Sequence, residues 1–181
     1  MERNSWLEAV RGHLAASSVG SSTLRMQSGA GCVERARTFL RRRVPVDGLR
    51  DFSGEEFARF LDAKTAGLAR ELPRLTDQCP NWGAARKVLS IFLRSCAMNR
   101  DLYRAYRLAR VEPFLEVPLD RQVVAAIDRA GGHSYAAKFS ISGLNRRTCR
   151  EIQEAAARVA ARRGLFRYQL DVLFWNAGGE T

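Results

Sequence analysis

Apolar residues recur three and four positions apart along most of this 181-residue chain. That spacing places them on one face of an α-helix, whereas the strict alternation typical of a half-buried strand is not sustained anywhere. The pattern predicts an all-α protein of about seven or eight helices. The predicted helices cover residues 5–15, 32–43, 54–72, 84–106, 121–131, 149–163 and 165–175.

Short polar motifs predict where two of these helices begin. Ser53 and Glu56 have the S-x-x-E spacing of a capping box, in which each side chain satisfies a backbone amide at the helix start. Thr148 and Glu151 have similar spacing and are a second candidate. Gly164 suits the C-terminus of the helix that Thr148 would open.

The chain is predicted to be a single domain spanning residues 1–181, because this length is sufficient for one well-buried core. Residues 16–31 are rich in Ser and Gly and are predicted to be a flexible loop. Pro45 ends one helix and Gly131 with Gly132 ends another. No repeat of fixed period is visible.

The charge balance adds a prediction about the partner. Thirty Lys and Arg residues against nineteen Asp and Glu give a net charge of +11, and nearly all of the positive charge is arginine. A guanidinium group can donate two parallel hydrogen bonds to the oxygens of one phosphate, so a nucleic acid is the expected partner. A GC-rich genome would explain the Arg/Lys ratio but not the net excess. Binding to a membrane surface is the competing interpretation, and the spread of the basic residues over several segments disfavours it.

Location and metal binding are also addressed by the sequence. No apolar run approaches the roughly 18–20 residues of a membrane span, and the first residues lead into no secretory signal, which predicts a cytoplasmic, nucleoid-associated protein. The four cysteines, Cys32, Cys79, Cys96 and Cys149, lie far apart without a C-x-x-C pair. They are expected to be reduced thiols, and neither a metal site nor a cofactor is predicted.

Two segments together suggest chemistry. The first is a turn with Pro80 and Gly83 between two helical patterns, and the second is the run Val-Pro-Leu-Asp-Arg-Gln-Val at 117–123. They resemble the helix-hairpin-helix DNA glycosylase superfamily, over residues 68–130. That family has a Pro-Gly-x-Gly-type hairpin on the DNA backbone, often a following lysine, and an essential aspartate in a Val-Pro-x-Asp-x-x-Val segment. The aspartate segment matches position for position, whereas Asn81 and Trp82 depart from the hairpin pattern.

The resemblance implies two helical lobes around a cleft and a catalytic Asp120, with Lys87 as the catalytic lysine. Asp120 would stabilise an oxocarbenium-like sugar or orient the attacking group, and it could equally be the N-cap of the next helix. Lys87 would be a nucleophile that forms a Schiff base, or else a phosphate contact on a helix facing DNA. The register of Lys87 is ambiguous, because counting from Gly83 places the family's lysine at Ala85.

Further residues are predicted to hold the DNA backbone. The turn would aim backbone amides at a phosphate, and Trp82 within it would act as a wedge in the base stack or simply pack inward. Residues 99–113 are an apparent insertion whose four arginines would share one helical face. The predicted DNA contacts are Pro80, Asn81, Trp82, Gly83, Ala84, Arg86, Arg121, Arg146 and Arg147.

The leading prediction is a monomeric enzyme that flips a nucleotide out of double-stranded DNA and cleaves the N-glycosidic bond, with or without lyase activity. One alternative keeps the fold and changes the chemistry: a glycosylase-like transferase that modifies hypermodified thymine in phage DNA, for example with an amino acid. The other alternative is a helical DNA-binding module without enzymatic activity, in which Asp120 is only a cap.

Overall fold

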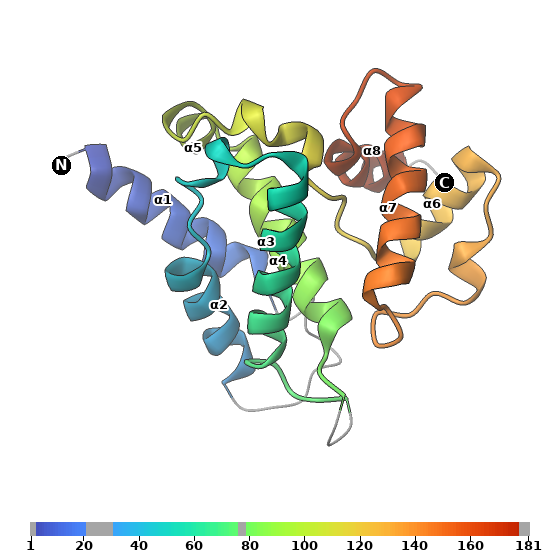
Figure 1. The fold of residues 1–181 in the computed structure, drawn as a ribbon, viewed down its shortest axis with the longest axis horizontal. Coiled ribbons are helices and arrows are strands. Elements are labelled where there is room, and N and C mark those ends of the chain that lie inside the picture. The colour runs from blue at the N-terminus through green and yellow to red at the C-terminus, as the bar shows by residue number, and fades with distance from the viewer. Residues whose placement is uncertain (1–2, 21–30, 76–78, 178–181) are drawn as a thin grey trace.

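The computed structural model describes residues 3–20, 31–75 and 79–177, which form eight α-helices, several short 3₁₀ turns and no strand (Figure 1). The all-α prediction is therefore confirmed. The predicted loop at 16–31 begins too early, because the first helix continues to Ser18, and residues 21–30 lie outside the described residues. The helices are α1 (Arg3–Ser18), α2 (Cys32–Arg43), α3 (Gly54–Ala69), α4 (Trp82–Met98), α5 (Arg100–Ala105), α6 (Arg121–Gly131), α7 (Arg146–Ala161) and α8 (Leu170–Ala177).

Side-chain caps define several helix starts. Ser53 accepts a hydrogen bond from the amide of Glu56, whose carboxylate accepts from the Ser53 amide at 2.8 Å, so the first capping box is confirmed. The second is wrong. Asn145 accepts from the amide of Thr148 at 3.0 Å, so α7 begins three residues earlier than predicted and Thr148 lies inside its first turn. Gly132, at φ 71°, ends α6 in the left-handed conformation that glycine tolerates.

The helix predicted over residues 84–106 is broken in two. The side chain of Asn99 accepts from the amides of Asp101 and Leu102, both at 3.1 Å, and thereby starts α5 as a separate helix. Arg107 has φ 51°, which turns the chain away after α5. The four arginines of this region therefore do not share one helical face, contrary to the prediction for Arg100, Arg104, Arg107 and Arg110.

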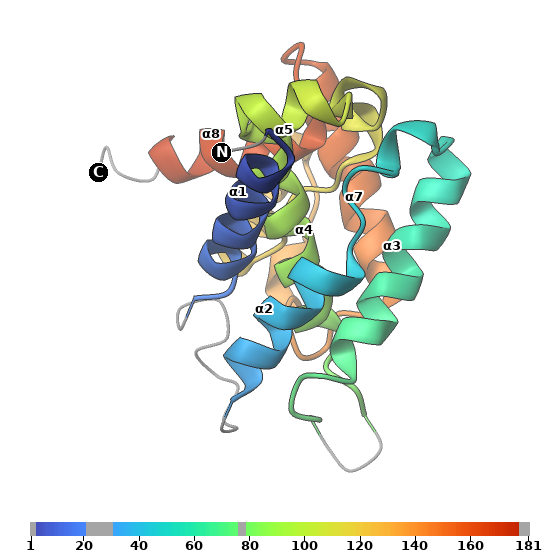
Figure 2. The same ribbon diagram turned by 90° about the vertical axis from the view of Figure 1, so that its left-hand side faces the viewer.

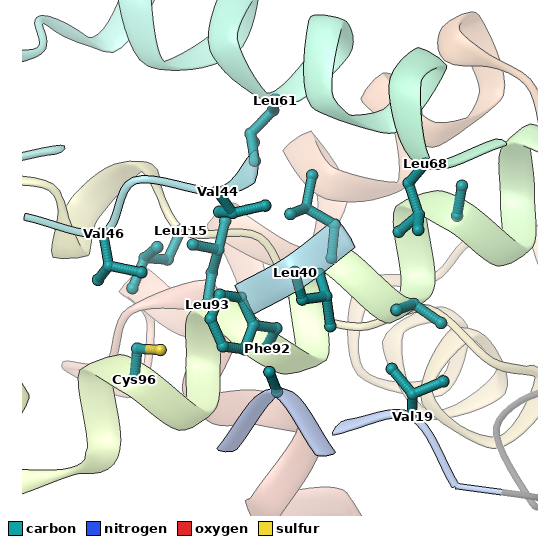
Figure 3. Packing of buried hydrophobic residues seen from close by; sticks show 14 of the residues in the cluster. Val19, Leu40, Val44, Val46, Leu61, Leu68, Phe92, Leu93, Cys96 and Leu115 are labelled. Atoms are coloured by element: carbon teal, nitrogen blue, oxygen red, sulfur yellow. The ribbon is translucent and has the colours of Figure 1, made fainter. Parts of the chain in front are cut away.

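Buried hydrophobic residues form two clusters. The first surrounds α4, which packs against both α1 and α3 (Figure 2). In Figure 3, Leu40 and Val44 from α2 and its C-cap converge on Phe92 and Leu93 of α4. The second cluster is built by α6, α7 and α8, with Ile152 among its fully buried side chains.

One extended segment, residues 115–120, connects the two clusters. Leu115 is buried in the first cluster, whereas Val117 and Leu119 are buried in the second. Arg167, beyond α7, donates hydrogen bonds to the carbonyls of Phe114 and Leu115, at 2.6 and 2.9 Å. These bonds tie the beginning of the extended segment to the chain that follows α7. No helix among the described residues is both long and apolar enough to cross a bilayer.

Candidate functional site

The structure brings together the two residues predicted to be catalytic. Lys87, in the second turn of α4, lies with its Nζ 3.4 Å from Oδ2 of Asp120, although 33 positions separate them in the chain. Their side chains are 18% and 22% exposed, so both are largely sheltered and still reachable from solvent. An amine and a carboxylate thus meet at the junction between the two hydrophobic clusters.

Asp120 uses its two oxygens for different tasks. Oδ1 accepts a hydrogen bond from the amide of Val123 at 2.9 Å, which makes Asp120 the N-cap of α6, and Oδ2 faces Lys87. The capping interpretation is confirmed. The cap fixes the orientation of the carboxylate, so the second oxygen is held in place to interact with a partner.

The backbone before Asp120 is held by a side chain from α7. The side-chain amide of Gln153 donates from Nε2 to the backbone carbonyl of Val117 at 2.7 Å, and its Oε1 accepts from the backbone amide of Val117 at 3.1 Å. Gln153 therefore pairs with this extended segment as a neighbouring strand would, and the position of Asp120 relative to α7 follows from it.

Arg86 fastens the same segment to α4. Its guanidinium donates to both carboxylate oxygens of Glu116 at 2.7 Å, and also to Asp62 at 3.2 Å and Thr65 at 3.1 Å. Burial opposes the charge of Arg86, but the neighbouring Glu116 carboxylate outweighs it, and the pKa of Arg86 is raised above its ordinary value. Trp82 covers the guanidinium at 5.4 Å.

This arrangement corrects the prediction for Arg86. Only 7% of the residue is exposed, and its donors are directed to carboxylates inside the protein, so Arg86 is not available to a phosphate. Asp62 also pairs with Arg146 of α7, which links α3 to the second cluster. Arg86 is therefore part of the support beneath Lys87 and Asp120.

The predicted phosphate anchor at the start of α4 is also corrected. Asn81 is fully buried and caps α4 by accepting from the Ala84 amide at 3.2 Å. A Cβ at Gly83 would lie 1.9 Å from the carbonyl oxygen of Ile141, because the loop before α7 rests directly on this turn. Asn81, Gly83 and Ala84 are thus covered, and glycine is needed at 83 for contact between segments rather than for contact with DNA.

The other two residues of the turn differ from these three. Trp82 is partly buried and packs against the second hydrophobic cluster, in agreement with the inward-packing alternative. Pro80 is exposed. Residues 70–81 separate α3 from α4, and part of this connection, 76–78, lies outside the described residues.

The remaining predicted DNA contacts are exposed and open two helices. Arg121 is the first residue of α6, and Arg146 and Arg147 are the first two of α7. Neither helix has an acidic residue in its first turn. Arginine is unfavourable there because the positive end of the helix dipole is nearby. Arg146 and Arg147 are paired with Asp62 and Glu151, respectively.

The described residues offer no group of three or more His, Cys, Asp or Glu side chains that could hold a metal ion. The thiols of Cys96 and Cys149 are buried, and burial raises the pKa of each to about 12. At the candidate site itself, Lys87 supplies an amine and Asp120 a carboxylate.

Sequence reasoning missed the residues that support the site, namely Asp62, Glu116 and Gln153. A weak signal existed for two of them. Asp62 directly follows Leu61 in the apolar stripe of α3, and Gln153 directly follows Ile152 in that of α7. Polar groups that close to a core face are usually hydrogen-bonded inside the protein.

Comparison with known proteins gives no relative: no family, no curated protein and no solved structure matches the chain.

Proposed function

We propose that this protein binds double-stranded DNA and acts on an extruded nucleotide at Lys87 and Asp120, most simply by cleaving the N-glycosidic bond. The observation that carries the proposal is the 3.4 Å approach of these two side chains across 33 residues. The segment that resembles that of the helix-hairpin-helix DNA glycosylases, residues 117–123, contains this aspartate. The amine that the resemblance implies is the one that faces it.

The pair suits cleavage at a sugar carbon. As the bond from C1′ to the base breaks, the base leaves with the bonding electrons and positive charge develops on the sugar. Oδ2 of Asp120, oriented by the capping bond to Oδ1, stabilises that charge. Water then adds to C1′, and the proton that it loses passes to the departed base. In a lyase version the amine of Lys87, in its neutral form, adds to C1′ in place of water, and the proton that the nitrogen then loses passes to the Asp120 carboxylate beside it. The target must leave the base stack, which costs a few kcal/mol that protein contacts offset.

The arginines at the starts of α6 and α7 are proposed to bind the phosphates of the DNA backbone. Arg121, Arg146, Arg147 and Arg150 are exposed. DNA phosphates would relieve the unfavourable arrangement of arginines at a positive helix end. The net charge of +11 supports the same partner. This surface replaces the turn at 80–84, where Asn81, Gly83 and Ala84 are buried, as the expected site of phosphate contact.

The test uses a panel of duplexes with damaged or modified bases, incubated with and without borohydride. Asp120→Asn keeps a good N-cap and removes the charge, so we expect a folded protein that forms at least 100-fold fewer abasic sites. Lys87→Ala abolishes borohydride trapping if the lyase version operates. Arg129→Ala, an exposed arginine at the far end of α6, is the control and retains activity.

The capping role of Asp120 favours one competing function, a DNA-binding module without chemistry, because the cap alone explains an aspartate at this position. That module is established if every duplex stays unaltered while binding weakens steeply with salt. A gain in the mass of the base, without abasic sites, would instead identify a transferase that modifies the base.

A further inference from the structure

A second site is formed by a hollow of about 430 Å³ away from Lys87 and Asp120. It is lined by two arginines, two phenyl rings, one carboxylate and one hydroxyl, from Arg50, Arg110, Phe52, Phe114, Asp51 and Ser53. They come from the connection between α2 and α3 and from the turns that follow α5, which contact each other. The volume falls within the roughly 300–1,000 Å³ of small-molecule sites.

The aromatic walls are firmly backed. The ring of Phe52 packs against Phe60 at 5.4 Å between centroids, and that of Phe114 packs against Phe57 at 6.3 Å. Phe57 is 1% exposed, and the carbonyl of Phe114 accepts a hydrogen bond from the partly buried guanidinium of Arg167. Both rings remain partly exposed. Aromatic rings that are held by neighbouring rings and stay partly exposed can stack on a planar ligand.

The cations of the hollow are accessible. Arg50 pairs at 3.5 Å with Asp51, which is itself exposed. For the guanidinium of Arg110, the described part of the chain supplies neither a hydrogen bond nor an ion pair. Arg107, three residues earlier, has a left-handed φ of 51° and precedes the short 3₁₀ turn Leu108–Arg110 that carries Arg110.

We propose that this hollow binds a nucleotide, whose base stacks on Phe52 or Phe114 and whose phosphate meets Arg110. Aromatic rings beside arginines are the usual means of holding single-stranded nucleic acid. Phe114 and Asp120 are six residues apart, so at most about 20 Å of chain separates the hollow from the candidate active site. The binding itself does not depend on chemistry at Lys87 and Asp120.

The experiment measures the affinity of the full chain for adenosine 5′-monophosphate by ligand-detected NMR. We expect Arg110→Ala and Phe114→Leu each to weaken binding at least fivefold, while Arg129→Ala and Arg146→Ala stay within twofold of the unmodified protein. Circular dichroism checks that each variant folds, and Phe52→Leu is the substitute if Phe114→Leu does not. Arg146 belongs to the proposed duplex-binding surface and not to the hollow. The affinity of Arg146→Ala for adenosine 5′-monophosphate therefore tests the hollow independently of duplex binding and of the proposed function.

Two ligands complete the test. Ribose 5-phosphate, which has no base, should bind at least fivefold more weakly than the nucleotide, and equal binding would overturn the proposal by showing a bare anion site. Unchanged binding in Arg110→Ala would also overturn it. A single-stranded hexanucleotide that binds at least tenfold more tightly than the mononucleotide, and that Arg110→Ala weakens, identifies a nucleic-acid strand as the source. Equal affinities identify a free nucleotide.

Discussion

The buried pair between Arg86 and Glu116 permits a quantitative prediction. The two side chains are 8% and 10% exposed and share two hydrogen bonds of 2.7 Å. Glu116→Ala would leave the guanidinium buried with only Asp62 and Thr65 as partners. Removal of one member of a buried pair costs about 3–5 kcal/mol. Because Asp62 and Thr65 still accept hydrogen bonds from the guanidinium, we expect the loss of unfolding free energy to lie at the lower end of this range, near 3 kcal/mol.

A double-mutant cycle built from Arg86→Met, Glu116→Met and the double variant sharpens this prediction. Replacing both charges by apolar side chains leaves no unpaired partner in the pair, so the double variant should be more stable than the sum of the two single losses indicates. We expect a coupling energy of at least about 2 kcal/mol in this double-mutant cycle. Met preserves much of the length of each side chain, which limits cavity formation.

Urea unfolding at pH 7, followed by circular dichroism, measures these energies, and Glu154→Ala, an exposed glutamate of α7, is the control. A loss of about 3 kcal/mol corresponds to a fall in Tm of roughly 6–12 °C for a chain of this size. Strict additivity of the two single variants would refute the reasoning, because it would mean that the two charges do not interact across the contact. So would a loss in Glu116→Ala no larger than that of the control.

Three further predictions concern other parts of the molecule. Gly83→Ala should destabilise the protein by at least about 1–3 kcal/mol in urea unfolding, since its Cβ meets a backbone oxygen at 1.9 Å, whereas Gly48→Ala, with nothing within 4 Å, should be nearly neutral. Ser53→Ala should cost about 1 kcal/mol through loss of the capping box, and an unchanged urea midpoint would contradict this. Burial raises the pKa of Cys96 and Cys149 from 9.0 to about 12, so the unfolded chain loses these protons first. The contribution of these two thiols to the free energy of unfolding is complete below pH 9 and is lost as the pH rises toward 12, by about 1.4 kcal/mol per pH unit for each thiol. The urea midpoint should therefore be lower at pH 10 than at pH 8.

Helix class and several helix ends could be predicted from the sequence because they depend on neighbours within one turn. The Ser53 capping box, the Asp120 cap and the Gly132 terminus each use groups no more than four residues away. Local signals nevertheless compete. Asn145, and not Thr148, is the N-cap of α7, and Asn99 starts a new helix within one that was predicted to be continuous. In both cases the asparagine side chain satisfies the first free backbone amides of the helix.

The residues of the candidate site were found from the sequence, but their surroundings were not. Lys87 and Asp120 stood out through residue type and motif, and their 3.4 Å approach follows from the path of residues 115–120 between the two clusters. Arg86 and Gly83 were misassigned to DNA contact. Their burial comes from Glu116 and Ile141, which lie 30 and 58 positions further along the chain.

The sequence by itself thus determined the helical class, the excess of positive charge and the candidate amine and carboxylate. These follow from periodicity, composition and short motifs, which act over a few residues. Only the tertiary structure decided which arginines are buried in ion pairs and which, such as Arg121 and Arg110, face solvent. The physical reason is that burial and pairing depend on contacts between segments far apart in the chain, to which a local pattern is insensitive.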